Sequence, residues 1–435
     1  MNIEARWLAV ALAAGIALGS AGKGWGSGFQ VRENSAAALG NAFAGAAAST
    51  EDLSIIANNP AGMTGLSGNQ VSGDLSIIIP SAVFAGTGFT AARQPISGGN
   101  GGDAGSARPV PAGYAFYDLS PDLKLGLALT APFGLKTQYN SDWVGRYQAI
   151  MSDIETVNIN PNVAYRVLDW LSVGAGPTIQ HTHTELTNAI NSTTIVHLAN
   201  PFLPAGLTFP DGSADVAGND WSVGYNLGLF AEVSPTTRLG ASYRSQISHR
   251  INGIATLTVP APLAASPQFQ NTPITAGLKT PDIVSLAATQ EISPELTLLT
   301  EVQWTNWSVI KNLRIERPDG SILSDQPEQW HGTWFGSIGA TWRPDPNWTF
   351  RGGFAFDESP VRDQFRTARL PDSNRYWLAV GLGYEWTQDL RLSAAYAHIF
   401  VASPSINELS QTGDVLVGHY SAHVDIVSLS ATFRF

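Results

Sequence analysis

The sequence of 435 residues contains no cysteine, so it can form no disulfide framework and no thiolate metal site. Charged residues make up only 14% of it, whereas about a quarter is usual for a soluble protein. It has no excess of basic residues, and its formal net charge of −11 argues against binding to nucleic acid. Beyond the N-terminus, no apolar run is long enough to form a transmembrane helix. Disulfide-stapled, nucleic-acid-binding and helical membrane proteins are therefore disfavoured.

The residues that are abundant indicate a different class. The chain has 43 glycines and 13 tryptophans, and 44% of its residues are hydrophobic. Low charge with many glycines and aromatic residues is typical of a β-barrel whose outer face meets lipid.

The N-terminus has the features of a secretory signal peptide. Arg6 precedes an apolar run, Trp7–Leu18, which is too short to span a bilayer and is followed by small residues. We predict a signal peptide at residues 1–26, with cleavage after Gly26, and Ala21 is the alternative cleavage position.

Alternating side chains mark the strands of a sheet over most of the chain. In Trp221–Val233 the odd positions are mostly large and apolar, whereas the even positions are mostly small or polar. The same alternation occurs in Val157–Val167, Tyr376–Trp386 and Val427–Phe435. Because successive side chains of a strand point to opposite faces, each of these strands has one apolar face and one small or polar face.

Turn-forming residues divide this region. Six short clusters, such as Leu119–Asp122 and Arg343–Asn347, alternate with seven longer connections, such as Gly86–Ser106 and Thr187–Asn219. These thirteen connections join fourteen strands, and short turns on one rim with long loops on the other are typical of outer-membrane barrels. The alternative, a soluble sandwich with one buried face, is disfavoured by the long strands and the signal peptide.

The stretch between Gly28 and Leu66 has neither the alternation of a strand nor the apolar stripe of a long helix. It is rich in Ala and Gly and precedes the whole sheet. We therefore predict an N-terminal plug (hatch) at residues 27–68 inside a barrel formed by residues 69–435.

Several short motifs occur in the order found in one known family. They are Gly28-Phe29-Gln30, Leu39–Gly45, Asn59-Pro60-Ala61, Asn347–Arg351, Phe356–Val361, Leu370–Trp377 and Ile406–Glu408. On these motifs the chain resembles the FadL family of outer-membrane transporters for long-chain fatty acids and other hydrophobic compounds. The resemblance implies an all-β membrane protein, a 14-stranded antiparallel transmembrane β-barrel with a plug in its lumen, in the outer membrane of a Gram-negative bacterium.

The resemblance also implies a passive route for the cargo. In this family a hydrophobic molecule passes from the outer loops to an internal pocket and leaves sideways where the third strand is kinked. Here that strand is Leu123–Thr130, and Pro132, Phe133 and Gly134 fall where the kink is expected. Pro132 removes a ladder donor and Gly134 relaxes the backbone, which favours interrupted pairing. An ordinary strand end entering an outer loop is the alternative interpretation.

A fatty-acid cargo needs a buried cation to bind its carboxylate. The candidates are Arg244, Arg250, Arg314 and Arg317, which the sequence alone does not place. Aromatic or aliphatic hydrocarbons need no counter-charge, so a hydrocarbon uptake channel is the alternative function. A general porin or an adhesin are further alternatives.

No enzyme, cofactor or metal site is predicted. No Ser-His-Asp order or nucleophile elbow stands out. His181, His183 and Glu185 have a spacing that could bind a metal, but we interpret them as polar lining of the barrel. The predicted partners are a hydrophobic small molecule, outer-membrane lipid and the outer-membrane assembly machinery. This machinery would recognise the terminal Phe435, and we predict that the protein is a monomer.

Overall fold

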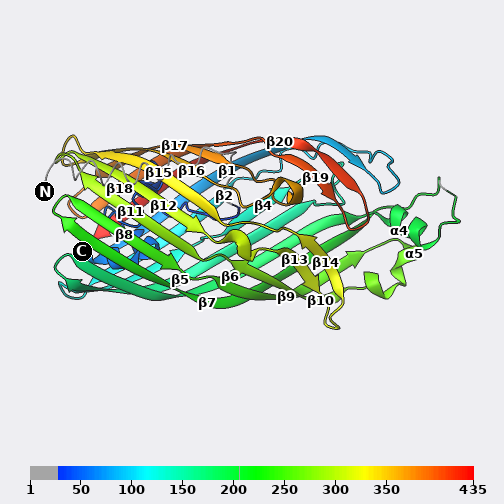
Figure 1. The fold of residues 1–435 in the computed structure, drawn as a ribbon, viewed down its shortest axis with the longest axis horizontal. Coiled ribbons are helices and arrows are strands. Elements are labelled where there is room, and N and C mark those ends of the chain that lie inside the picture. The colour runs from blue at the N-terminus through cyan, green and yellow to red at the C-terminus, as the bar shows by residue number, and fades with distance from the viewer. Residues whose placement is uncertain (1–27, 205) are drawn as a thin grey trace.

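The computed structural model describes residues 28–204 and 206–435, and the predicted signal peptide lies outside them. In this part of the chain one antiparallel sheet closes on itself, because β1 (Gln70–Phe89) pairs with both β2 (Arg108–Asp118) and β20 (Val415–Arg434). Figure 1 shows the resulting barrel from the side. No helix among the described residues is long and apolar enough to cross a membrane.

The other strands complete the wall. They are β3 (Leu123–Thr130), β4 (Gly134–Gln138), β5 (Met151–Leu168), β6 (Leu171–Ile190), β7 (Gly212–Ser234), β8 (Thr237–Arg244), β9 (Ile247–Thr258), β10 (Thr272–Thr280), β11 (Ile283–Glu291), β12 (Leu296–Thr305), β13 (Asn312–Glu316), β14 (Ile322–Pro327), β15 (Thr333–Trp342), β16 (Trp348–Asp357), β17 (Arg375–Glu385), β18 (Leu390–Val401) and β19 (Ser405–Leu409). Six pairs continue one another across a break: β3/β4, β8/β9, β10/β11, β12/β13, β14/β15 and β18/β19. The described residues thus form fourteen wall strands, which confirms the predicted fold class.

The two faces of the wall differ as the alternation predicted. Along β7, Val223 is 65% exposed on the outside, whereas Asn226 and Phe230 are buried on the inside. Large apolar side chains are also exposed in alternation along β1, β5, β17 and β20. Leaving so much apolar surface in water would cost about 25 cal/mol per Å², so this outer face is built to meet lipid.

The interpretation of His181, His183 and Glu185 as lumen lining is wrong. His181 lies beside the outward-facing Trp221, with 4.8 Å between ring centroids, and His183 and Glu185 share its side of β6. The inward positions of β6 are the buried residues between them, such as Thr182. The exposed apolar Val173 and Ile179 occupy the same alternate positions of β6, so these positions face outward.

The two rims differ in the length of their strands and loops. Short turns gather at the end where the C-terminus lies, and the opposite end carries the loops with α4 (Ser192–Ala199) and α5 (Ala261–Ala264) (Figure 1). At that end the pairing of β6 with β7 continues to Ile190 and Gly212. The loop between them is therefore shorter than the connection Thr187–Asn219 predicted from the sequence. These outer strand ends lack the apolar alternation, because beyond the bilayer both faces of a strand meet water.

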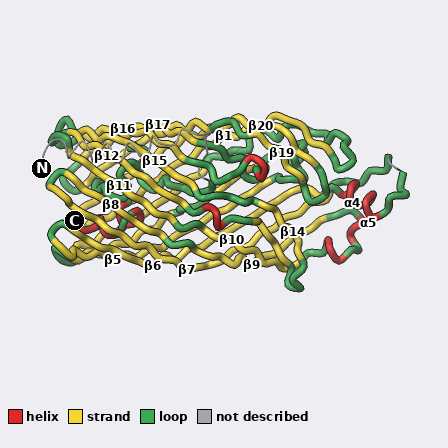
Figure 2. The backbone as a smooth tube through the Cα atoms, in the orientation of Figure 1, coloured by secondary structure: helices red, strands yellow, loops and turns green. Residues whose placement is uncertain are grey.

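The N-terminal segment, residues 28–66, lies inside the lumen. It contains α2 (Ala36–Gly40), α3 (Ile55–Asn58) and the 3₁₀ turn η1 (Pro60–Gly65), drawn in red within the wall in Figure 2. Its hydrogen bonds reach several sides of the wall. Asn41 donates to Thr341 on β15 at 3.1 Å, and Thr64 donates to Ser172 on β6 at 2.7 Å.

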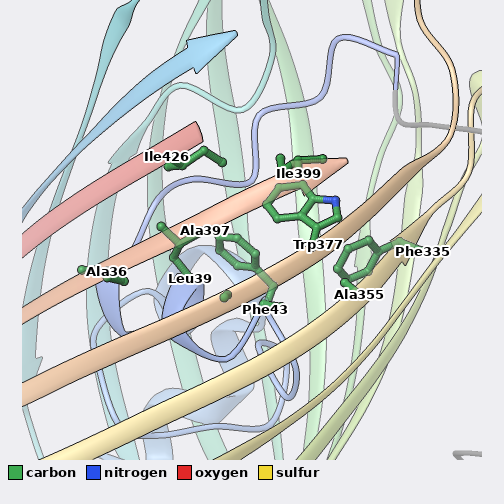
Figure 3. Packing of buried hydrophobic residues seen from close by; sticks show 12 residues of the cluster. Ala36, Leu39, Phe43, Phe335, Ala355, Trp377, Ala397, Ile399 and Ile426 are labelled. Carbon is green, nitrogen blue, oxygen red and sulfur yellow. The ribbon is translucent and has the colours of Figure 1, made fainter. Parts of the chain in front are cut away.

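Close packing between the N-terminal segment and the wall explains the small residues on both sides. Leu39 and Phe43 pack against Trp377 and its neighbours on β17 and β18 (Figure 3). A Cβ atom built at Gly353 would lie 2.2 Å from the backbone of Asn41. Glycine is thus required where the two backbones approach, because any side chain would displace the segment.

Candidate transport site and wall gap

The wall is interrupted beside the third strand. Backbone pairing between β2 and β3 ends at Gly113 and Leu129, although β2 continues outward to Arg108. In the same stretch β4 pairs with β5. No register pair joins β2 to β4 in the described part of the chain. A gap in the hydrogen-bonded wall therefore lies between the outer half of β2 and β4.

The residues predicted for the kink lie at this gap and contact the start of the N-terminal segment. Val31 donates a backbone hydrogen bond to Pro132 at 2.8 Å, and Gly134 donates one to Phe29 at 2.9 Å. The kinked stretch, Ala131–Phe133, separates β3 from β4, and Phe133 turns into the lumen with 2% exposure. The structure thus brings together two predicted groups, Gly28–Gln30 and Pro132–Gly134.

Phe133 belongs to an aromatic cluster that closes the inner side of the gap. Its ring lies 5.8 Å from Phe29 and 6.0 Å from Trp307, both edge-on. Trp330 packs against Phe29 and Trp307 in the same cluster. Edge-on aromatic contacts of this kind stabilise by about 0.5–1.5 kcal/mol beyond burial, so the start of the N-terminal segment is anchored at the kink through Phe29.

The largest cavity described lies at the same place, with a volume of about 760 Å³. The N-terminal segment, the kink and the outer halves of β1, β2 and β5 line it. Most of its lining is apolar, and Ile78, Leu129 and Leu135 are representative. An apolar cavity that reaches the wall at a gap can hold a hydrophobic molecule and give it a path to lipid.

Asn59, in the predicted Asn59-Pro60-Ala61 motif, is fully buried between the N-terminal segment and the wall. Its amide donates to the carbonyl of Ala47 at 2.7 Å and to that of Leu229 on β7 at 2.9 Å. Its side-chain oxygen accepts from the Ala61 N–H at 3.2 Å. One side chain thus joins two parts of the segment to the wall.

We expect Asn59→Ala to destabilise this anchoring by about 1–3 kcal/mol, because buried carbonyls lose their donor. Hydrogen exchange at residues 47–62 should rise, while exchange in the wall strands stays the same. Asn58→Ala is the matched control, since Asn58 is less buried and its described side-chain hydrogen bonds, to Ser54 at 3.4 Å and from Asn34 at 3.3 Å, stay within the N-terminal segment. Equal effects of the two substitutions would contradict the role of Asn59.

A second anchor lies at the rim with the short turns. The carboxylate of Glu51 accepts from Arg343 and from Arg351, the latter at 3.0 Å, and Arg391 donates to its carbonyl at 2.7 Å. Burial alone would raise the pKa of Glu51, but the guanidinium groups of Arg351 and Arg343 bring it below its ordinary value. Glu51 therefore stays ionised and joins the segment to β16, to β18 and to the turn that follows β15.

The four predicted carboxylate partners lie in different places. Arg244 faces the lumen, donates to Ala57 at 3.2 Å and lines an inner cavity of about 60 Å³. Arg317 lines an outer pocket of about 430 Å³ between the loops. Arg250 is exposed on β9, and Arg314 is 48% exposed and paired with Glu316. The structure brings none of the four together.

Arg32 and Arg369 are two further candidate cations, which were not predicted from the sequence. Arg32 lies in the inner cavity with Arg244, and its guanidinium is 4.0 Å from the ring centroid of Phe335. Its Nε is buried without a hydrogen-bond partner among the described residues. Arg369 lines the outer pocket beside Arg317. For Arg32 a signal existed, since it is a charged residue within a segment predicted to be buried.

A lipid-facing barrel with an occupied lumen, an apolar cavity and an interrupted wall defines an outer-membrane transporter of hydrophobic molecules. Residues 17–435 match the family described as "Outer membrane protein transport protein (OMPP1/FadL/TodX)". The chain belongs to this family. Its members are outer-membrane transport proteins and not enzymes.

Alignments with relatives and with solved structures of the family cover most of this chain. A "Long-chain fatty acid transport protein" of Salmonella typhi is 28% identical over 414 residues, which cover 92% of this chain and 93% of that protein. The crystal structure of a Pseudomonas aeruginosa FadL homologue has a TM-score of 0.87 and 25% identity, and covers 94% of this chain and 100% of that one. The Pseudomonas putida toluene transporter TodX has a TM-score of 0.66 and 16% identity, covering 94% and 99%, and shows the fold alone.

Proposed function

We propose that this protein carries long-chain fatty acids or similar hydrophobic molecules passively across the outer membrane. The cargo enters between the outer loops, binds in the cavity of about 760 Å³ and leaves sideways through the gap between β2 and β4. The observation that carries the proposal is that this cavity and the gap coincide. The fatty acid transport protein of Salmonella typhi, to which the chain is similar, supports this class of cargo.

The side exit has a physical reason. For a hydrocarbon tail that crossed a water-filled lumen, exposure to water would cost a free energy of about 0.8 kcal/mol per methylene. The N-terminal segment occupies the straight path, whereas the gap leads from the apolar cavity to the lipid-facing surface. A tail that moves from the cavity into lipid remains in apolar surroundings throughout.

The buried cations favour an acid over a neutral hydrocarbon as cargo. Arg32 and Arg244 line an inner cavity of about 60 Å³, which can hold a head group but not a chain. The guanidinium of Arg32 is already ion-paired with Asp357 at 3.7 Å, but its Nε has no hydrogen-bond partner among the described residues, which leaves one donor for an incoming carboxylate. The alternative is a hydrocarbon uptake channel, which the aromatic cluster around Phe133 would also suit. Mass spectrometry of lipid co-purified with the protein distinguishes the two, since a hydrocarbon found in place of an acid would contradict the first.

Gly134→Ile should slow uptake of a labelled long-chain fatty acid several-fold. A Cβ atom at Gly134 would meet only Val31 at 3.4 Å and a carbonyl at 3.6 Å, so the protein should still fold. The added branches would extend the side chain at the edge of the cavity and narrow the exit. Gly277→Ile, on β10 where a Cβ atom meets nothing within 4 Å, is the control. Normal uptake by Gly134→Ile would remove the kink from the route.

The proposal also includes the division into plug and barrel, the role of Phe435 and the oligomeric state. Residues 27–68 act as the plug and 69–435 as the barrel, which agrees with the start of β1 at Gln70. Phe435 follows the last strand and is 69% exposed, as a recognition signal for the assembly machinery should be. The protein works as a monomer, because its sheet is closed and leaves no unpaired edge along β1 and β20.

A further inference from the structure

We propose that Arg108 is a latch that holds the wall gap closed, and that release of its ion pairs sets the rate at which cargo leaves through the side. The inference rests on the lateral exit proposed above and adds the residue that controls it. It concerns the outer end of β2, where this strand borders the gap.

Arg108 lies where β2 has lost its partner on one side. In the sheet it pairs with Ile78 of β1, and no residue of β4 faces it in the described pairing. Its guanidinium instead reaches across to β5, with Nη2 at 3.0 Å from the Asp153 carboxylate and Nη1 at 3.7 Å from that of Glu155. These ion pairs join the two edges of the wall where backbone hydrogen bonds do not.

The ion pairs also lie across the path of the cargo. Arg108, Asp153 and Glu155 all line the cavity of about 760 Å³, together with apolar residues of β2 and β4. A molecule that moves from this cavity to lipid between β2 and β4 must pass the side chain that bridges them. Closing and opening of this bridge therefore changes the width of the exit.

The bridge can open without unfolding the wall. Arg108 is 42% exposed and Glu155 is 58% exposed, so their ion pair contributes little to stability, whereas Asp153 is only 11% exposed. Asp153 keeps a partner when Arg108 leaves, because it is also paired with Lys136, its neighbour in the sheet on β4. No carboxylate is left buried and unpaired in the open state, so the open state is accessible at ordinary temperature.

The first test is removal of the latch charge. Arg108→Gln should raise the initial uptake of a tritium-labelled long-chain fatty acid about two- to fivefold, because it removes both ion pairs of a half-exposed arginine. The cells used should lack a carrier of their own. Arg238→Gln is the matched control, because Arg238 pairs with Glu291 at 3.2 Å between β8 and β11, which are joined by backbone pairing and border no gap. An uptake by Arg108→Gln that is unchanged or lower, relative to this control, would overturn the latch.

The second test locks the gap. The chain has no cysteine of its own, so in the double variant R108C/E155C a short bis-maleimide can link only the two introduced thiols. Linking should reduce uptake to the level of cells without the protein. Either single variant should show the same uptake before and after treatment with the reagent. Retained heat-modifiable migration on a gel shows that the barrel is folded.

The two tests separate the two claims. Full uptake by the cross-linked protein would contradict the lateral exit itself, and the latch with it. A block by the cross-link, combined with no effect of Arg108→Gln, would leave the lateral exit standing and overturn the latch alone. Faster uptake by Arg108→Gln with a block by the cross-link supports both.

Discussion

Deletion of residues 27–67 is expected to leave a folded barrel that conducts ions freely. The wall closes through the ladder between β1 and β20, which runs from Gln70–Arg434 to Phe89–Val415 and uses no residue of the N-terminal segment. A fourteen-stranded barrel without its interior segment leaves an aqueous channel, so single-channel conductance in planar bilayers should rise by about an order of magnitude. The same variant should admit small hydrophilic solutes to liposomes.

The fold of the deletion variant is checked separately from its conductance. Far-UV circular dichroism and heat-modifiable migration on a gel should show the sheet intact, although the loss of contacts to Trp377 and its neighbours lowers the melting temperature. An intact barrel with the conductance of the full-length protein would show that something other than the N-terminal segment closes the lumen. High conductance in both proteins would instead be the outcome for a general porin, whose lumen is open.

The barrel could be predicted from the sequence because lipid imposes a two-residue period on the wall. Val223 and its neighbours on β7 show the pattern clearly, since one face meets hydrocarbon and the other meets the packed lumen. The strand ends in Thr187–Asn219 could not be predicted, because outside the bilayer neither face needs to be apolar. Register depends on the partner strand and leaves no local signal, whereas the outward side of His181 follows from the exposed apolar Val173 and Ile179 at the same alternate positions of β6.

The site was predictable in its parts and not in its assembly. Pro132 and Gly134 indicate a break from their own backbone chemistry. Their pairing with Phe29 and Val31 is a contact between segments far apart in the sequence, and no spacing or composition encodes it. The same holds for Arg108, whose role depends on β5 residues across a gap that exists only in the folded wall.

The second large effect is expected from two adjacent glycines of β16 that point to opposite faces. A Cβ atom at Gly353 would lie 2.2 Å from the backbone carbonyl of Asn41, whereas one at Gly352 would meet nothing within 4 Å. Gly353→Val should displace the N-terminal segment from the wall at a cost of about 1–3 kcal/mol, as overpacking does. Because backbone atoms cannot rotate away as a side chain can, the segment itself must move.

Gly352→Val controls for every effect of valine in that strand, since both changes add the same β-branched side chain to β16. Its side chain would face the lipid beside the exposed Val380, and we expect normal stability and closed channels. Gly353→Val should instead show bursts of conductance that approach those of the deletion variant, with faster hydrogen exchange at residues 39–46. If both valine variants leak, the wall and not the segment is disturbed; if neither leaks, the contact between Gly353 and Asn41 does not hold the lumen closed. Leakage confined to Gly353→Val would place the barrier in the contact between one wall strand and the N-terminal segment.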